Sequence, residues 1–182
     1  HLGEKLRWAK RTLWEETTRV PLIFAGPGIV TNQKCSRSVG LIDVFPTLLD
    51  LAQLPQRTDL EGTSLKPLLE NPKSPWNRPT ICTFGPNNHS LRGNQYRYTR
   101  YADGSEELYN HRDDPNEWKN LLSGQNASNE SHQVANRMRR WLPNHNADPI
   151  LGSAGSDSPL YGEGNISLGE AMKRGEARRE KK

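Results

Sequence analysis

The sequence is poor in apolar residues and contains no long apolar run. Hydrophobic residues make up 32% of the 182 positions, which is below the share found in most globular domains. No run approaches the roughly 20 apolar residues of a membrane-spanning helix, and no charged segment followed by an apolar one opens the chain. We therefore expect no membrane partner, and we expect part of the chain to be unfolded or to depend on segments that lie outside it.

Cysteine is scarce, and the charge is balanced over most of the chain. Cys35 and Cys82 are the only cysteines and form no CxxC or Cys/His cluster, so we expect free thiols rather than metal ligands. The net charge of +4 arises largely from residues 173–182. No aromatic residues are interleaved with these basic ones, which favours a solvated basic end over a nucleic-acid-binding arm. We expect no nucleic-acid partner.

The first half of the chain has the pattern of an α/β protein. Residues 20–26 form a continuous apolar run that Gly26-Pro-Gly28 closes, which is typical of a buried strand. Apolar residues dominate positions 41–54, where Asp43, Thr47 and Asp50 form a single polar stripe at helical spacing. This pattern predicts a largely buried helix that ends before Pro55. A strand followed by a buried helix indicates layered α/β architecture.

The pattern changes near residue 75, where prolines interrupt all periodicity. Beyond it, residues 80–84, 95–101 and 106–109 predict a three-stranded antiparallel meander with a turn at Gly93-Asn94. Val134, Met138 and Trp141 lie on one side of a predicted helix over residues 129–142, which would cover one sheet face. After Pro143 no apolar spacing remains, so we expect no fixed structure. Three regions are therefore predicted, covering residues 1–75, 76–145 and 146–182, the last a disordered basic tail.

Residues 1–145 carry a series of ordered motifs. The motifs of the first half are His1-Leu-Gly-Glu-Lys-Leu-Arg-Trp-Ala-Lys10, Trp14-Glu-Glu-Thr-Thr-Arg-Val-Pro-Leu-Ile23, Gly26-Pro-Gly28, Ser38-Val-Gly-Leu-Ile-Asp-Val-Phe-Pro-Thr-Leu-Leu-Asp50 and Leu60-Glu-Gly-Thr-Ser-Leu-Lys-Pro-Leu-Leu69. Those of the second half are His89-Ser-Leu-Arg92, Tyr96-Arg-Tyr98, Asp103-Gly-Ser-Glu-Glu-Leu-Tyr109 and Asp114-Pro-Asn-Glu-Trp-Lys-Asn-Leu121. In this order the motifs resemble a known family, the formylglycine-dependent sulfatases of the alkaline-phosphatase-like superfamily, and the likeness is greatest to the iduronate-2-sulfatase group.

The resemblance implies both a fold and an activity. The fold is the C-terminal part of an alkaline-phosphatase-like sulfatase α/β domain, followed by a small antiparallel sheet-and-helix subdomain. The activity is hydrolysis of a sulfuric ester on a sulfated sugar or glycosaminoglycan-like polysaccharide. Such enzymes use a formylglycine from a Cys/Ser-x-Pro-x-Arg motif, which this sequence lacks, and usually calcium. The resemblance places both upstream of His1, so we expect an inactive fragment of a secreted or periplasmic enzyme, without metal ligands of its own.

Four residues are candidates for binding the substrate. By resemblance, Lys10 lies where the family places a lysine on the sulfate, and its ammonium would stabilise charge on the leaving oxygen. The alternative is a solvated loop lysine. His1 follows the expected metal motif and would meet the sugar or sulfate, or would be a passive loop residue. His89 and Arg92 would bind a carboxylate or hydroxyl of the substrate, or would be surface strand residues.

Two other functions fit the sequence. A phosphodiesterase or phosphonate hydrolase of the same superfamily would share this scaffold, and comparative kinetics on sulfate and phosphate esters would distinguish it from a sulfatase. A non-catalytic module that binds an acidic polysaccharide would use the basic tail and the aromatic hairpin without turnover. The residues upstream of His1 would separate this module from an enzyme.

Overall fold

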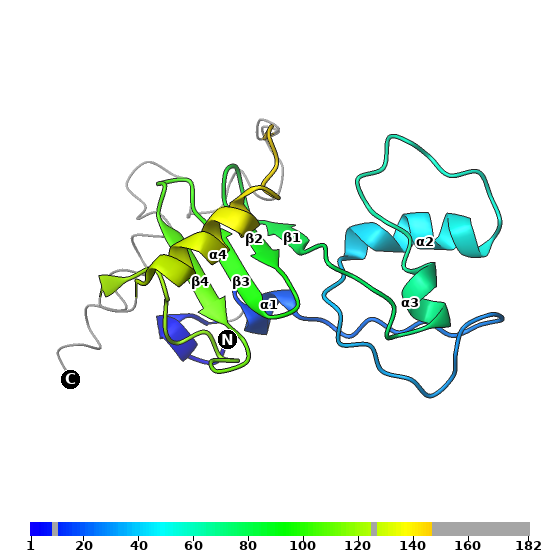
Figure 1. Cartoon of the computed structure of the whole chain (residues 1–182), viewed down its shortest axis with the longest axis horizontal. Coiled ribbons are helices and arrows are strands. Elements are labelled where there is room, and N and C mark those ends of the chain that lie inside the picture. The colour runs from blue at the N-terminus through cyan, green and yellow to red at the C-terminus, as the bar shows by residue number, and fades with distance from the viewer. Residues whose placement is uncertain (9–10, 125–126, 147–182) are drawn as a thin grey trace.

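A computed structural model describes residues 1–8, 11–124 and 127–146 of the chain. Figure 1 shows a part built around a sheet and a smaller helical part joined to it by extended segments. None of the helices in the described ranges has the length and apolar character that crossing a membrane requires. The regular elements are, in order, η1 (Glu4–Leu6), α1 (Glu15–Thr18), η2 (Leu41–Asp43), α2 (Val44–Leu51), α3 (Lys66–Glu70), β1 (Thr80–Thr83), β2 (His89–Arg92), β3 (Tyr96–Arg100), β4 (Glu106–Asn110) and α4 (Asn129–Arg139).

The sheet is an antiparallel meander with the strand order β1-β2-β3-β4. Ser90 pairs with Cys82 on one side and with Thr99 on the other, so β2 is an inner strand. The predicted three-stranded meander was therefore wrong in its number of strands. The segment His89-Ser-Leu-Arg92 contains a single apolar residue, which hid its strand character. The predicted turn at Gly93-Asn94 does lie directly before β3, but the strand that it joins to β3 was not predicted.

Helix α4 covers one face of the sheet. Its Val134 and Ala135 are buried against Leu91, Tyr98 and Leu108, and each large apolar side chain of this cluster contributes roughly 1.5–3 kcal/mol by leaving water. Ser128 begins the helix by accepting a hydrogen bond from the backbone N–H of residue 131. The predicted helix is confirmed over residues 129–139. Its predicted contact at position 141 is wrong, because the helix ends first and that tryptophan is 53% exposed.

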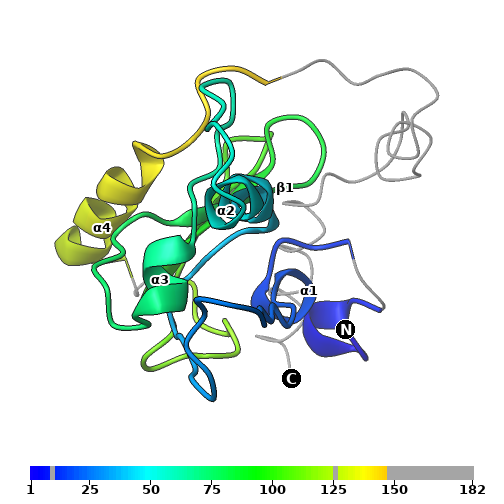
Figure 2. The same ribbon diagram turned by 90° about the vertical axis from the view of Figure 1, so that its right-hand side faces the viewer.

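The opposite face of the sheet carries polar residues and is covered by the N-terminal segment. Figure 2 shows α4 and α1 on opposite sides of the sheet. Leu13 and Trp14 are buried there against Tyr101 and Tyr109. Leu13 and Trp14 therefore pack on a sheet that begins about 65 positions later. The region boundary expected near residue 75 stays a prediction.

Two polar side chains are buried in the helical part, beside an apolar cluster of Leu65, Leu68 and Trp76. Asp43 and Thr47 are 2% and 0% exposed, because the Asp43 carboxylate accepts hydrogen bonds from the backbone N–H groups of Gly40 and Thr63. The Thr47 hydroxyl donates to the carbonyl of Asp43 and accepts from the N–H of Leu65. The predicted polar stripe therefore holds α2 to the loop before α3.

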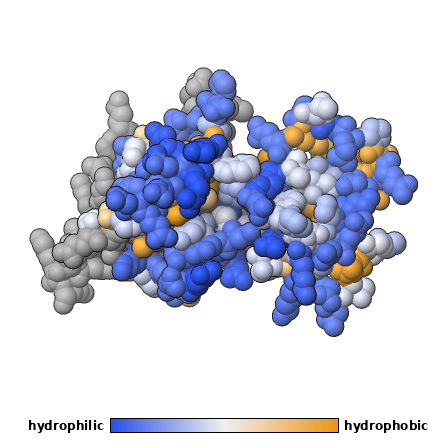
Figure 3. Space-filling model, in the orientation of Figure 1, coloured by the Kyte–Doolittle hydropathy of each residue, from blue (hydrophilic) through white to orange (hydrophobic). Residues whose placement is uncertain are grey.

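The apolar side of α2 faces outward. Leu41, Phe45 and Leu48 are 67%, 48% and 51% exposed, and Figure 3 shows hydrophobic residues on the surface of the helical part. Residues 20–24 adopt no regular strand, and Ile23 is 86% exposed. The predictions of a buried strand and a largely buried helix are thus wrong for this chain, since none of its described residues covers these apolar groups.

Candidate functional site

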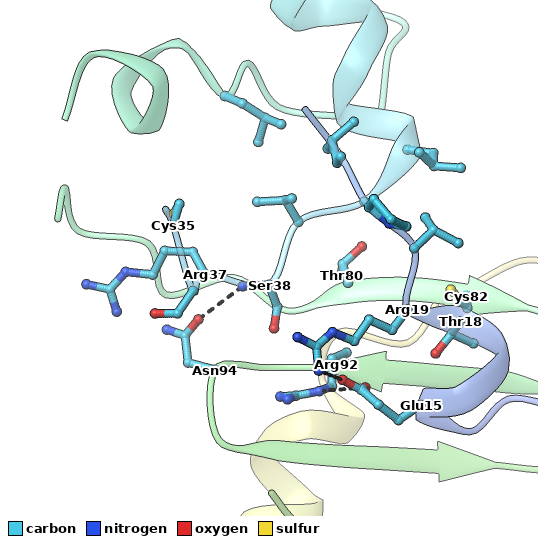
Figure 4. Close-up of a pocket in the computed structure, with 18 of the residues that line it drawn as sticks. Glu15, Thr18, Arg19, Cys35, Arg37, Ser38, Thr80, Cys82, Arg92 and Asn94 are labelled. Atoms are coloured by element: carbon cyan, nitrogen blue, oxygen red, sulfur yellow. Dashed lines mark hydrogen bonds and ion pairs between the residues drawn. The ribbon is translucent and has the colours of Figure 1, made fainter. Parts of the chain in front are cut away.

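A cleft of about 1550 Å³ separates the polar face of the sheet from the helical part. Its sheet side is formed by α1, β1 and β2, and its other side by residues 20–42 and α3. Figure 4 shows Glu15, Arg19 and Arg92 together on the sheet side, with Arg37 and Asn94 farther along. The side chain of Asn94 accepts a hydrogen bond from the backbone N–H of Ser38 at 3.4 Å. The cleft therefore joins segments that lie far apart in the sequence.

Glu15 is held by two arginines on the sheet side of the cleft. Its Oε2 lies 2.5 Å from Nη2 of Arg97 and 3.2 Å from Nε of Arg92. Burial by itself raises the pKa of the Glu15 carboxyl, but the charges of the two arginines outweigh it and the pKa is lowered. The carboxylate therefore stays ionised and offsets part of the positive charge of β2 and β3 at the cleft.

Glu117 completes this network from the loop after β4. Its side chain is fully buried and accepts hydrogen bonds from Nε of Arg97 at 2.5 Å and from the backbone N–H of Glu15 at 2.9 Å. His111 Nε2 lies 2.7 Å from the same carboxylate. Burial by itself raises the pKa of the Glu117 carboxyl. The hydrogen bond from His111 and the charge of Arg97 outweigh this effect, so the pKa is lowered. The network fixes α1 to the sheet.

The described residues contain one group of potential metal ligands, formed by Glu15, His111 and Glu117 with donor atoms within 4.8 Å of one another. Arg97 lies between the two carboxylates, 2.5 Å from an oxygen of each. A guanidinium keeps its proton and supplies no ligand atom, and its charge repels a cation. Calcium also prefers six to eight oxygen ligands. This group therefore does not fit the calcium ion that the family resemblance implies.

The structure separates the two candidate residues of β2. Arg92 lies at the cleft, where it contacts Glu15 and donates to the carbonyl of Gly93. His89 is 5% exposed and its Nδ1 lies 2.9 Å from the Thr83 hydroxyl. Burial lowers the pKa of His89, which favours the neutral imidazole. His89 and Arg92 point to opposite faces, because side chains three positions apart on a strand do so.

His1 is packed against the N-terminal segment. Its side chain is buried, its Nε2 lies 2.8 Å from the Thr12 hydroxyl, and its ring meets Trp14 edge-on with centroids 5.7 Å apart. Lys10 lies outside the described residues. The structure therefore does not bring His1 together with His89. The roles of these residues stay predictions.

Sequence reasoning missed Glu15, Arg97, Glu117 and Lys5. The ammonium of Lys5 lies 4.2 Å from the ring centroid of Trp14 and 4.6 Å from that of Tyr109. Burial lowers the pKa of Lys5, against the charge of nearby Glu107. For Arg97 a signal existed, since alternation in Tyr96-Arg-Tyr98 places the arginine on the face opposite the two tyrosines. The partners of that arginine are 20 and 82 positions away.

Comparison with solved structures defines the class of the fold. A sulfatase structure from Bacteroides thetaiotaomicron superposes with a TM-score of 0.55 and 29% identity, over 71% of this chain and 30% of its own. A structure described as bound to its substrate, D-glucosamine-2-N,6-O-disulfate, gives a TM-score of 0.57 and 26% identity over 77% and 32%. The chain thus has part of the alkaline-phosphatase-like sulfatase fold, and the predicted α/β class is confirmed.

Sequence comparison defines the family. The family profile described as N-sulphoglucosamine sulphohydrolase, C-terminal, matches residues 3–144, and the chain belongs to the sulfatase family. A sulfatase from Formosa agariphila is 35% identical over 94% of this chain and 34% of its own length. Human arylsulfatase K is 32% identical over 65% of this chain and 25% of its own length. The chain thus spans a quarter to a third of these relatives.

Proposed function

We propose that the protein is a sulfuric ester hydrolase that acts on a sulfated sugar of a glycosaminoglycan-like polysaccharide. The observation that supports this most is the 35% identity to the Formosa agariphila sulfatase across 94% of the chain. The substrate class is supported by two similar structures, one described with a glucosamine disulfate as its substrate and the other as a 2-O glycosaminoglycan sulfatase. Iduronate 2-sulfate remains a substrate that we propose on the resemblance alone.

The cleft supplies cations suited to such a substrate. The Arg19 side chain is 81% exposed and has only a 3.9 Å contact with Glu15, so most of its donors face solvent. Arg92 lies beside it, with part of its charge offset by the same carboxylate. Arginine suits sulfate and carboxylate groups because its planar fork offers parallel N–H donors. We therefore assign Arg92 to substrate binding, with Arg19 as a neighbour.

Lys10 and His1 are proposed to act at the reacting group. A lysine ammonium stabilises the negative charge that develops on the sulfate and on the leaving oxygen. An imidazole donates to anionic oxygens or moves a proton near neutral pH, and His1 would do so through the ring that now contacts Thr12. His89 lies on the other face of the sheet from Arg92, so its proposed substrate contact would be made apart from this cleft.

The family's other requirements are proposals as well. Formylglycine supplies the nucleophile and calcium the charge stabilisation in sulfatases, and the resemblance places the residues that provide them upstream of His1. None of the described residues forms a group that fits calcium, so we assign no step to either. A secreted or periplasmic location is proposed on the same resemblance.

Steady-state kinetics of the protein in its full natural length would test this function. We expect release of sulfate from glucosamine sulfates or iduronate 2-sulfate, with at least tenfold lower kcat/KM on matched phosphate or phosphonate esters. Lys10→Ala should lower kcat by about 10²–10³ while leaving the melting temperature unchanged. Lys10→Arg should recover little of this loss, since a planar fork does not replace a compact ammonium.

Three results would contradict the proposal in different ways. A preference for phosphonate esters would identify a phosphonate hydrolase. Binding of sulfated polysaccharide without turnover would identify a binding module. Turnover of Lys10→Ala within about threefold of wild type would be consistent with a sulfatase but would show that Lys10 does not act on the sulfate.

A further inference from the structure

Helix α4 ends in a turn that presents an aromatic side chain to solvent. Leu142 packs on the core cluster beneath the helix, whereas its neighbour Trp141 is 53% exposed. The backbone N–H of Trp141 donates to the carbonyl of Met138 at 2.9 Å, and that of Leu142 donates to the carbonyl of Arg139 at 3.1 Å. These hydrogen bonds and the packing of Leu142 fix the turn, so the indole is held outward in a defined place.

Two arginines lie beside this indole on the helix surface. Arg137 and Arg140 are exposed, and among the described residues neither side chain takes part in an ion pair or a hydrogen bond. Residues three and four positions apart are neighbours on a helix, with Cβ atoms about 5–6 Å apart. Arg137, Arg140 and Trp141 therefore form one surface, which we call the Arg/Trp surface.

Arg139 has a structural role that its two neighbours do not share. Its Nη2 lies 2.9 and 2.7 Å from the two carboxylate oxygens of Glu106, and its Nε donates to the Tyr98 hydroxyl at 3.2 Å. These contacts join α4 to β3 and β4. Basic residues near the C-terminal end of a helix also interact favourably with its dipole, which accounts for positive charge at this end but not for an exposed indole beside it.

The Arg/Trp surface lies on the far side of the sheet from the cleft. Helix α4 and α1 cover opposite faces of the sheet (Figure 2), and among the described residues none of α4 lines the cleft. Figure 3 shows mainly hydrophilic side chains over α4. A ligand bound on this surface would therefore be held apart from Arg19 and Arg92.

The chemistry of this surface suits a sulfated sugar chain. An indole is amphipathic and packs its flat face against the C–H groups of a sugar ring, while a guanidinium offers parallel N–H donors to a sulfate or carboxylate. Single-stranded nucleic acid is bound instead on several aromatic rings, one for each stacked base, and the described part of this surface offers a single ring.

We propose that Arg137, Arg140 and Trp141 form a second binding site, an exosite that holds a sulfated polysaccharide away from the ester that is hydrolysed. The identity of the polysaccharide rests on the proposed function, but the binding itself does not require turnover. Two exposed arginines and one ring bind a single sugar weakly, because exposed charges are screened by salt. The exosite therefore favours a chain long enough to contact all three side chains.

Calorimetric titration of the complete 182-residue chain with a heparin-derived hexasaccharide would test the exosite. Trp141→Ala and the double variant Arg137→Gln/Arg140→Gln should each weaken binding by about five- to tenfold. The loss in the double variant should shrink as the ionic strength is raised, whereas the loss in Trp141→Ala should persist. The melting temperature should be unchanged in both, because these side chains are exposed.

Two control variants match these changes elsewhere on the chain. Arg57→Gln/Lys73→Gln removes the same charge from two exposed positions outside the Arg/Trp surface. Trp118→Ala removes an indole that is 47% exposed and lies in the loop before α4. Each control should bind the hexasaccharide within about twofold of wild type, and a desulfated hexasaccharide should bind all proteins at least about tenfold more weakly.

Amide chemical shifts in the same titration would locate the ligand. The largest changes should fall on residues 137–142. Changes confined to the residues of the cleft, or to the basic residues 173–182, would overturn the proposal. So would hexasaccharide affinities of Trp141→Ala and of the double variant within about twofold of wild type. Tighter binding of a single-stranded oligonucleotide with shifts at residues 137–142 would identify a nucleic-acid surface instead.

Kinetics of the protein in its full natural length would separate the exosite from the proposed function. Trp141→Ala should raise KM for a sulfated polysaccharide by about fivefold but leave kcat and KM for a sulfated monosaccharide unchanged. Hexasaccharide binding at residues 137–142 without any release of sulfate would support the exosite and count against the proposed function. Release of sulfate with the same KM for the polysaccharide in wild type and Trp141→Ala would support the function and overturn the exosite.

Discussion

Glu117→Gln is expected to be among the most destabilising isosteric changes in this chain. The substitution keeps the shape of the side chain but removes the charge that faces Arg97, whose side chain is 2% exposed. Removing one member of a buried ion pair costs about 3–5 kcal/mol. Because Glu15 still contacts the same guanidinium at 2.5 Å, we expect a loss of about 2–4 kcal/mol in the free energy of unfolding.

Urea denaturation followed by tryptophan fluorescence would measure this loss, since Trp14 is buried next to the network. Asp59→Asn is the matched control, because Asp59 pairs with Arg57 at the surface, where both side chains are more than half exposed, and it should have no measurable effect. A double-mutant cycle with Arg97→Met should give a coupling of at least about 1 kcal/mol. A Glu117→Gln protein within about 0.5 kcal/mol of wild type would refute the reasoning.

Three further predictions concern acid, packing and the tail. Burial lowers the pKa of His89 in the folded protein, so its contribution to stability is present above about pH 6.5 and is lost as pH falls toward that lowered pKa. The urea midpoint of His89→Gln should therefore depend less on pH between pH 7 and 5 than that of wild type. Gly62→Ala should destabilise the helical part by about 1–3 kcal/mol, since a Cβ there would lie 2.1 Å from the carbonyl oxygen of Ile42, and wild-type stability would contradict this. Removal of residues 150–182 should leave the melting temperature unchanged, because no apolar periodicity exists there to bury, whereas a drop of many degrees would show that this segment docks.

Acid should also weaken the network beneath the cleft. The pKa of Glu117 is lowered in the folded protein, so its stabilising contribution is fully present above about pH 4.3 and is lost as pH falls through the lowered value. The pKa of Glu15 is lowered as well, so both carboxylates act in the same pH window. The Glu117→Gln protein should therefore lose less stability between pH 5 and 3 than wild type does, and equal losses would show that other groups dominate acid unfolding.

The sequence by itself determined the features whose partners are close in the chain. The turn at Gly93-Asn94 was predicted from its own two residues, and α4 from its apolar spacing over Val134 and Met138. The family was also predicted from the ordered motifs, because each motif is a short local sequence pattern. Strand β2 was missed because His89-Ser-Leu-Arg92 contains a single apolar residue, Leu91, and shows no apolar alternation.

Only the tertiary structure decided which side of an element is inside. In α2 the periodicity shows two unlike faces, yet Thr47 is buried and Phe45 exposed, because the buried hydroxyl finds its donor at Leu65, 18 positions away, while no described residue covers the phenyl ring. Likewise no role was predicted for Glu117 from the sequence, and the residue is fully buried in the fold. Burial of a polar group is stable only when its partners are in place, and those partners come from segments that spacing along the chain does not reveal.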